Sequence, residues 1–260
     1  MKFEMKDVSF SYDGTNPIIQ NINLVLDQPG LYCIVGPNGV GKSTLVKCMN
    51  RILKPTSGQV FIDGQEISTL TSRDISEKIG YVPVSTEECF SVPVLDAILL
   101  GRYNKSKWKT TAKDIEMADR AMEMMGVTDL AMRNYTQLSA GQHQKVNLAR
   151  GIVQETQMLI LDEPTANLDV KHQVYISQLL RALSVQENMI IVMISHDLNI
   201  AAKYSHEVIV MSKPGVIYSK GKPEDVFSEK TIMDVYEIGC SISDDNGRPH
   251  MMWGSINTLW

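Results

Sequence analysis

Short apolar runs alternate with amphipathic stretches along most of this chain. The runs NINLVL, LYCIV and QVFID have the pattern of strands, MLILD and MIIVMIS have the pattern of buried strands, and Lys42 to Leu53 has the pattern of a helix. Because strands and helices alternate in this way, the sequence predicts an α/β fold in which helices cover a largely parallel central sheet.

The pattern changes over residues 85–150. Ile115, Ala118, Met122 and Met125 recur at steps of three or four, which places them on one helix face, and no convincing strand interrupts the stretch. This region is therefore expected to form an inserted helical subdomain. Its methionine-rich segment EMADRAMEMMGVTDLAM is open to two interpretations, an adaptable docking surface or core filling, and we favour core filling.

The last part of the chain, after Gly221, is more polar and its pattern has a shorter period. The segment SDDNGRP is typical of a turn between two strands. Residues 222–260 are therefore expected to form a tail and not a separate domain.

Composition narrows the classes of function. The 260 residues suffice for one large α/β domain or two small ones, and the net charge of −5 argues against general nucleic-acid binding, which needs clustered Lys and Arg. The sequence contains no run of eighteen apolar residues, so it predicts no membrane span. The four cysteines lack a Cys-x-x-Cys spacing and no secretory-like segment precedes them, which favours reduced thiols over disulfides or zinc.

The clearest chemical motif is GPNGVGKST, Gly36 to Thr44, which fits the pattern G-x-x-x-x-G-K-[ST] and directly follows the strand LYCIV. Its glycines let successive backbone N–H groups point at a phosphate, and the helix that follows adds the positive end of its dipole. Lys42 is expected to reach the β and γ phosphates, and the Ser43 hydroxyl to bind Mg²⁺. The alternative is an ordinary glycine-rich turn. We reject it, because the full motif occurs with a predicted strand before it and a predicted helix after it.

Acidic and imidazole side chains follow two other predicted strands. MLILDEP ends its apolar run at Asp162, which can hold Mg²⁺ through water, and Glu163 is a candidate general base for the attacking water. MIIVMIS precedes His196, a candidate contact to a γ-phosphate. Solvated strand-end acids and a structural histidine are the simpler alternatives. We favour function, since ligands of open α/β sheets bind at the carboxyl edge of the strands.

Together these residues resemble the ATP-binding subunit of an ABC transporter over nearly the whole chain. Gly36–Thr44 is similar to the Walker A loop of that family, Met158–Asp162 to its Walker B strand and Glu163 to its catalytic glutamate. The resemblance also implies that ANLD, ending at Asp169, is the D-loop, that His196 is the switch histidine and that Tyr12 in FSYDG stacks on adenine.

The stretch LSAGQHQKVNLAR contains a second small-residue turn that opens a helix. Ser139 and the amides around Gly141 make another anion-binding end, although a Ser helix cap alone is a simpler interpretation. Leu138 to Gln142 resembles the family signature LSGGQ, which closes on the ATP held by the Walker A loop of a second subunit. Because this chain has one Walker A loop, the resemblance implies a homodimer.

Two positions depart from the family pattern. Ala140 stands where the family has glycine, which is tolerated if this backbone does not need a positive φ. Val84 stands where the family has a glutamine that contacts Mg²⁺ and the attacking water, and valine can do neither. Hydrolysis or coupling is then impaired unless Thr86, Glu87 or Glu88 substitutes.

VLDAILLGR and DDNGRPHMMW resemble the subfamily that energises import of iron-siderophores, haem or cobalamin. The resemblance implies ATP and Mg²⁺ as cofactors, membrane permease subunits as partners, an extracytoplasmic substrate-binding protein as an indirect partner, and a peripheral location on the cytoplasmic side of the cell membrane. A soluble ABC-type ATPase and a regulator with impaired hydrolysis are the alternatives.

The implied architecture is a single ABC ATPase domain, 1–260. Its P-loop NTPase core, 1–84 and 155–221, contains a mainly parallel sheet and an antiparallel N-terminal β part, and 85–154 form the helical subdomain with the signature. The predicted site residues are Glu163 and His196 for catalysis, Ser43 and Asp162 for the metal, and for the nucleotide Tyr12, Gly36, Pro37, Asn38, Gly39, Val40, Gly41, Lys42, Ser43, Thr44, Ser139, Gly141, Gln142 and Asp169.

Overall fold

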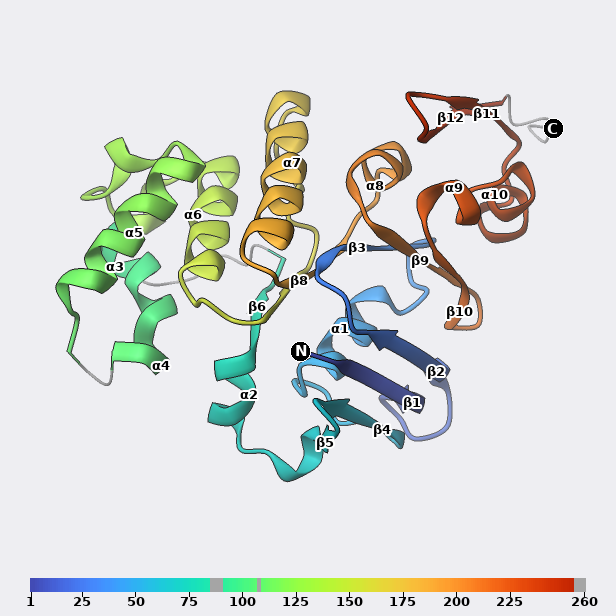
Figure 1. Ribbon diagram of the computed structural model, residues 1–260, viewed down its shortest axis with the longest axis horizontal. Helices are drawn as coiled ribbons and strands as arrows, with labels where there is room; N and C mark the ends of the chain where they lie inside the picture. Colours follow the sequence, from blue (N-terminus) through green and yellow to red (C-terminus); the bar gives the residue numbers. More distant parts are fainter. Residues whose placement is uncertain (85–90, 107–108, 255–260) are drawn as a thin grey trace. The chain divides into compact units, whose positions relative to one another are not determined.

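The computed structural model describes residues 1–84, 91–106 and 109–254, and the chain divides into two compact units (Figure 1). The first unit contains Met1–Thr69 and the described residues from Ser177 on, and the second contains Leu70–Ile176. The second boundary falls inside α7 (Val170–Gln186). In sequence, the second unit is therefore an insertion into the first.

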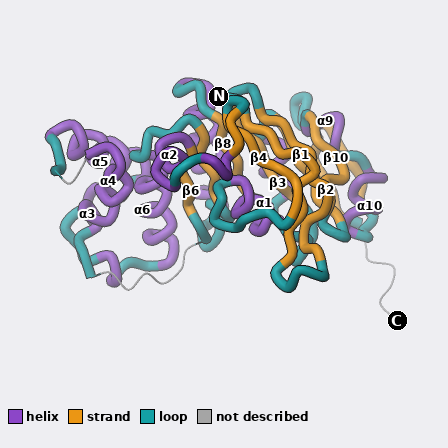
Figure 2. Tube along the Cα trace, turned by 90° about the horizontal axis from the view of Figure 1, so that it is seen from below, coloured by secondary structure: helices purple, strands orange, loops and turns teal. Residues whose placement is uncertain are grey.

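An antiparallel sheet forms the N-terminal part of the first unit. Its strands follow the order β2 (Pro17–Leu26), β1 (Phe3–Ser11), β4 (Ser57–Ile62) and β5 (Gln65–Glu66), and Figure 2 shows β1, β2 and β4 side by side. Phe3 pairs with Leu26 on one side and with Ile62 on the other, and all three side chains are buried. Alternating apolar positions therefore bury one face of this sheet.

The parallel part of the first unit has the strand order β10 (Val216–Gly221), β9 (Glu207–Ser212), β3 (Gly30–Val35) and β8 (Ile190–Ile194). β3 is parallel to both of its neighbours, and only the β9–β10 hairpin is antiparallel. Every residue of β3 and β8 is buried, as expected for strands covered on both faces. Ile34 pairs with Ile194, so the segments after both strands leave the sheet at the same edge.

The helix after β3 is shorter than the sequence predicted. α1 spans Lys42–Met49 and does not continue to Leu53. Arg51 adopts a left-handed backbone with φ 59°, which is incompatible with a continuing right-handed helix.

The C-terminal segment of the first unit contains α9 (Pro223–Val226), α10 (Glu229–Tyr236) and the hairpin of β11 (Cys240–Asp244) with β12 (Pro249–Trp253). Asn246 and Gly247 have φ of 56° and 79°, the conformation that a tight hairpin turn requires, so the turn predicted from SDDNGRP is confirmed. The side chain of Asn199, on α8 (Leu198–Tyr204), bonds to both the N–H and the C=O of Met251. The hairpin is thus attached to α8.

The second unit contains one short parallel pair, β6 (Ile79–Val82) with β7 (Met158–Leu161), and a group of helices. Figure 1 shows α3 (Val94–Leu99), α5 (Ala112–Met125) and α6 (Ala140–Ile152) side by side. Among the described residues of 85–150 there is no strand beyond a single bridge between Pro93 and Asn134.

Methionine burial in this unit is mixed. Met122 and Met125 fill the core together with Ala118, but Met124 and Met132 are exposed. Ile115 lies on the same face of α5 as Ala118, Met122 and Met125, as the spacing predicts, but it is 43% exposed and does not belong to the core. At 100° per residue Ile115 falls at the margin of the apolar stripe, in the first turn of α5.

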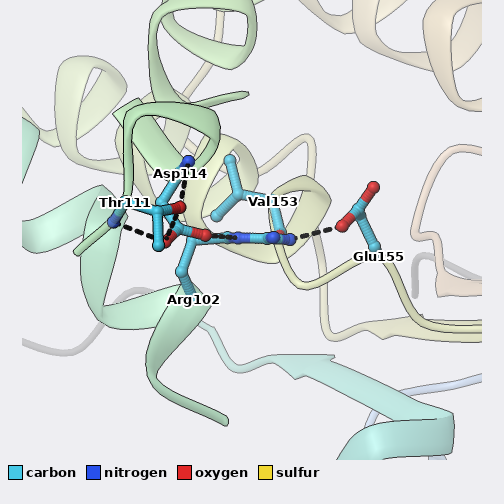
Figure 3. A network of polar contacts seen from close by, with 5 residues as sticks. All are labelled: Arg102, Thr111, Asp114, Val153 and Glu155. Atoms are coloured by element: carbon cyan, nitrogen blue, oxygen red, sulfur yellow. Dashed lines mark hydrogen bonds and ion pairs between the residues drawn. The ribbon is translucent and has the colours of Figure 1, made fainter. Parts of the chain in front are cut away.

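A buried arginine links three helical segments of the second unit (Figure 3). Arg102, at the end of η2 (Leu100–Arg102), donates from Nε to Asp114 Oδ1 at 2.8 Å, and from Nη1 to the Val153 carbonyl at 2.8 Å and Glu155 Oε2 at 2.6 Å. Asp114 also accepts from the backbone and hydroxyl of Thr111, which closes the N-terminal capping box of α5. The network therefore joins the start of α5 to the end of α6.

The remaining elements are short: η1 (Ile67–Thr69), α2 (Ser72–Lys78), α4 (Tyr103–Ser106), η3 (Thr128–Leu130) and η4 (Tyr135–Gln137). No helix in the described part of the chain is both long enough and apolar enough to cross a bilayer.

Candidate functional site

The loop between β3 and α1 has the backbone of a phosphate cradle. Gly36, Gly39 and Gly41 have φ of 154°, 78° and 99°, a region that side chains other than glycine rarely enter. A Cβ on Gly36 would lie 2.4 Å from the carbonyl oxygen of Met211, and one on Gly41 would lie 2.8 Å from Ile19 Cγ2. The tight curl of this loop therefore depends on glycine at both positions.

The start of α1 adds positive potential to the same loop. Gly41 is the N-cap and offers no side chain to the first amides of the helix, which suits a helix end that receives an anion. Lys42 is buried, and its Nζ donates to the carbonyls of Gly36 at 2.8 Å and Pro37 at 2.9 Å. Its charge is thus held inside the loop, where the residues present fit a polyphosphate.

His196 leaves the sheet at the same edge as this loop. The N–H of Ser195 donates to the Ile34 carbonyl at 3.1 Å, which continues the pairing of β8 with β3. The Ser195 hydroxyl donates to the Asp197 carbonyl and accepts from the Asp197 N–H, forming a tight turn with the exposed His196 at its tip. Within the first unit, the structure therefore brings His196 and the loop from Gly36 to one edge of the sheet.

Tyr12 follows β1 at the start of an ordered turn. Its ring is 66% exposed and packs edge-on against Phe10, with the centroids 4.8 Å apart. Asp13 accepts from the N–H groups of Thr15 and Asn16, which holds the turn in place. The ring is therefore presented to solvent on a fixed backbone, and its adenine contact stays a prediction.

In the second unit, Asp162 lies buried at the end of β7. Its N–H donates to the Val82 carbonyl at 2.9 Å, and the Tyr81 hydroxyl donates to its Oδ2 at 3.5 Å. Burial, and next the charge of Asp162, raise the pKa of the Tyr81 phenol well above its usual range. The alternative that Asp162 is merely a solvated acid at a strand end is therefore excluded by its burial.

Glu163 has a strained backbone. Its φ is 53°, in the left-handed region that non-glycine residues seldom occupy. Its carbonyl accepts from the N–H of Ala166 at 3.1 Å and from Nε2 of Gln144 at 3.4 Å. Its side chain is half-buried. Strain of this kind is concentrated at functional sites, which agrees with the predicted role of Glu163.

The signature segment opens α6 with a complete capping box. The Ser139 hydroxyl accepts from the Gln142 N–H at 3.3 Å, and Gln142 Oε1 accepts from the Ser139 N–H at 2.9 Å. Ala140 is the first residue of the helix and has no positive φ, so replacing the family glycine introduces no backbone strain. A Cβ on Gly141 would lie 3.4 Å from the Asn167 carbonyl, so the predicted signature lies beside the predicted D-loop.

Asp169 is engaged in the helix that follows. Its Oδ1 accepts from the His172 N–H at 2.9 Å and lies 2.8 Å from His172 Nδ1, which caps the start of α7. These hydrogen bonds lower the pKa of the Asp169 carboxyl. Val84 is half-buried after β6, whereas Thr86, Glu87 and Glu88 lie outside the described residues.

Sequence reasoning missed two residues of this region, Tyr81 and Gln144. Gln144 lies on the buried stripe of α6 with Asn147, Leu148 and Gly151, so an amide in an apolar 3.6-residue repeat was the available signal. Tyr81 gave no such signal, because its partner Asp162 is distant in sequence.

A glycine-rich loop between a buried parallel strand and a helix, with a buried aspartate after another such strand, defines a P-loop nucleotide-binding protein. The chain matches the ABC transporter family over residues 19–166, more than half of its length. The ABC transporter ATP-binding protein MJ0089 of Methanocaldococcus jannaschii, itself uncharacterized, is 39% identical over 249 residues, 96% of each chain.

Two further comparisons agree. The petrobactin import ATP-binding protein FpuD of Bacillus anthracis is 36% identical over 93% of this chain and 89% of its own. The structure of the ATP-binding cassette MJ0796, a dimer in a post-hydrolysis state bound to ADP and Pi, matches with a TM-score of 0.76 at 26% identity, covering 85% of this chain and 98% of that one.

The chain therefore belongs to the ABC transporter family, as an ATP-binding subunit and an ATPase that serves transport. The predicted fold class is confirmed: a P-loop NTPase core with parallel strands, an antiparallel N-terminal β part and helices.

Proposed function

We propose that this ATPase energises the import of a metal chelate, namely an iron-siderophore, haem or cobalamin, across the cytoplasmic membrane. The observation that carries the cargo class is the 36% identity, over 93% of the chain, to a petrobactin import ATP-binding protein. The ATPase acts from the cytoplasmic side as a peripheral subunit, bound to membrane permease subunits. These in turn receive cargo from an extracytoplasmic substrate-binding protein.

In this proposal Gly36–Thr44 binds the ATP phosphates, with Lys42 on the β and γ phosphates and Tyr12 on the adenine. The positive-φ glycines and the buried ammonium support the phosphate assignment. Ser43 and Asp162 hold Mg²⁺, and the residues fit that ion, because a hydroxyl and a buried carboxylate are the oxygen ligands that it prefers. When bound, the ion neutralises phosphate charge.

Glu163 is the general base for the attacking water and His196 contacts the γ-phosphate. The strained backbone of Glu163, and the position of His196 at the edge shared with the phosphate loop, support these roles. Ser139, Gly141 and Gln142, with Asp169, face the ATP of a second copy in a homodimer. The dimeric ADP-bound state of the MJ0796 cassette supports that assembly. We retain 85–154 as the helical subdomain, 1–84 and 155–221 as the core and 222–260 as the tail.

Reconstitution tests the cargo and the direction together. The chain is purified with its copurifying permease subunits and placed in vesicles that enclose ATP, and uptake of a ferric siderophore, haem and cobalamin is measured with the matching binding protein outside. ATP-dependent accumulation of one of them is expected, and Glu163→Gln serves as the hydrolysis-deficient control. Accumulation of none of the three, with ATPase activity intact, contradicts the cargo class.

The alternative of a regulator with impaired hydrolysis is motivated by Val84 alone and is opposed by the buried Asp162 and the strained Glu163. Steady-state phosphate release decides between them. Turnover of the complex that is stimulated by cargo-loaded binding protein supports the importer, and a complex that binds ATP without releasing phosphate supports the regulator.

A further inference from the structure

We propose that Gln144 is a positioning residue for ATP hydrolysis, which holds the backbone turn that carries Glu163 through its buried side-chain amide. This inference rests on the proposed role of Glu163 as the general base. All of the groups involved lie within the second unit, and the signature helix α6 supplies the donor.

The geometry fixes which end of the amide faces the turn. Gln144 is 1% exposed, and its Nε2 donates to the Pro164 carbonyl at 2.9 Å and to the Glu163 carbonyl at 3.4 Å. Both partners are acceptors only, so the opposite orientation of the amide would bring its oxygen against two carbonyl oxygens. The NH₂ group is therefore the part of the side chain that acts on Glu163.

The other end of the amide makes a structural explanation insufficient. Gln144 Oε1 is buried and has no hydrogen-bond partner among the described residues. A buried acceptor without a partner costs stability, so an apolar side chain of equal length would suit a purely structural position better. What the amide provides, and a hydrocarbon cannot, is donation to the turn at Glu163.

The turn needs such a restraint. Glu163 has φ 53°, and the proline that follows it further restricts its backbone. Left-handed backbone at a non-glycine residue persists only where the surroundings hold it. Besides Gln144, the N–H of Ala166 contributes one bond to the same carbonyl at 3.1 Å. Removing the amide thus lets the backbone relax and redirects the carboxylate.

The position of the donor couples two functional segments. Gln144 lies in the second turn of α6, the helix that Ser139 caps. A small rigid shift of α6 displaces the donor from the two carbonyls, so the direction of the Glu163 carboxylate depends on where the signature helix lies. The base is therefore correctly aimed only in one position of α6.

Two substitutions test this inference. Gln144→Met keeps the length and removes the donor, and Gln144→Glu replaces the donor by an acceptor. In both variants, kcat is expected to fall by about 10- to 100-fold relative to the wild-type assembly, because misplaced catalytic groups cost that much, and Kd for ATP is expected to stay nearly unchanged. Asn147→Leu is the matched control, since Asn147 is an equally buried amide on α6 that pairs with the Tyr135 hydroxyl instead.

The pH profile separates positioning from packing. A buried glutamate has a raised pKa, and its protonated form regains one O–H donor toward the turn. The kcat of Gln144→Glu, divided by that of wild type at each pH, should therefore rise as pH falls, whereas the ratio for Gln144→Met stays flat. Equal, pH-independent losses in Gln144→Met, Gln144→Glu and Asn147→Leu would indicate packing alone and overturn the inference.

Glu163→Gln distinguishes this failure from failure of the proposed function. If Glu163→Gln abolishes turnover and Gln144→Met turns over like wild type, the positioning inference is wrong and the base assignment stands. If Glu163→Gln itself keeps full turnover, the base assignment is wrong. Should Gln144→Glu fail to fold, as judged by thermal unfolding, the split between kcat and Kd in Gln144→Met still decides.

Discussion

At the scale of single residues, Lys42 shows how the loop from Gly36 to Thr44 holds a positive charge in position before a ligand binds. Its ammonium group is bonded to the carbonyls of Gly36 and Pro37, which a phosphate must replace or join. A charge-assisted bond to phosphate is stronger than a bond to a neutral carbonyl, so the exchange favours binding.

Lys42→Ala is therefore expected to weaken ATP binding by about 10- to 100-fold, the loss of one or two hydrogen bonds to a charged group. Isothermal titration with ATP and Mg²⁺ measures the effect. Lys47→Ala, which removes a half-buried lysine from the last turn of the same helix, is the control and should bind ATP like wild type. Equal affinity of Lys42→Ala and wild type would show that the loop does not bind the phosphates.

Val84 gives the opposite expectation, an increase of activity. Because valine cannot contact magnesium or water, Val84→Gln should raise turnover by about tenfold through better orientation of water, with little change in ATP affinity. Phosphate release and Kd are measured on the same preparation. If instead Glu87→Ala or Glu88→Ala cuts turnover and Val84→Gln changes little, one of those carboxylates performs the glutamine's role.

At the scale of elements, the network of Arg102 holds the helical part of the second unit together. Removing one partner of a buried ion pair leaves the other charge uncompensated, at a cost of about 3–5 kcal/mol. Arg102→Met is therefore expected to lower the free energy of unfolding by about that amount. Arg120→Met breaks an exposed pair with Glu116 and should have little effect.

The same network predicts a pH dependence. Hydrogen bonds from Thr111, and next from Arg102, lower the pKa of the Asp114 carboxyl from 3.8 to about 2. A lowered folded-state pKa stabilises the fold above the unfolded value, and this stability is lost as pH falls through the folded value. The difference in Tm between wild type and Asp114→Asn should thus be full at pH 5 and shrink between pH 4 and pH 2. A constant difference over that range contradicts the assignment.

Elements that have a clear local sequence pattern could be predicted, and the contacts between elements could not. β3, β7 and β8 were recognisable because continuous apolar runs indicate strands covered on both faces, and the loop from Gly36 to Thr44 because its spacing is local. The end of α1 depends on the left-handed backbone of Arg51, which a periodic pattern does not encode. Gln144 required knowledge of which carbonyls face its amide.

At the scale of the whole molecule, substitutions in the predicted signature test whether two chains share each ATP. Ser139 caps α6, so a bulky replacement changes both the helix and any interface. Ser139→Asp preserves the cap, because aspartate is an equally good N-cap residue, but adds a negative charge where a triphosphate is expected. In a Glu163→Gln background it should prevent ATP-dependent dimers in light scattering and leave Tm unchanged.

Ser139→Ala is the complementary variant. It removes the cap at a cost of about 1 kcal/mol but adds no charge, so ATP should still induce dimers at a lower Tm. Dimers of Ser139→Asp that form with ATP as readily as those of the parent would contradict the shared site.

The interrupted sequence of the first unit has a consequence for synthesis on the ribosome. β3 emerges early, yet its two sheet neighbours, β8 and β9, lie beyond Ile190, after the entire second unit. At a rate of about 5–20 residues per second, β3 waits on the order of ten seconds for its partners. During that interval Leu70–Ile176 is complete and free to fold, whereas β3, whose residues are all buried in the folded chain, still lacks both of its neighbouring strands. We therefore expect nascent chains that stop before Ile190 to expose this strand and to be prone to aggregation.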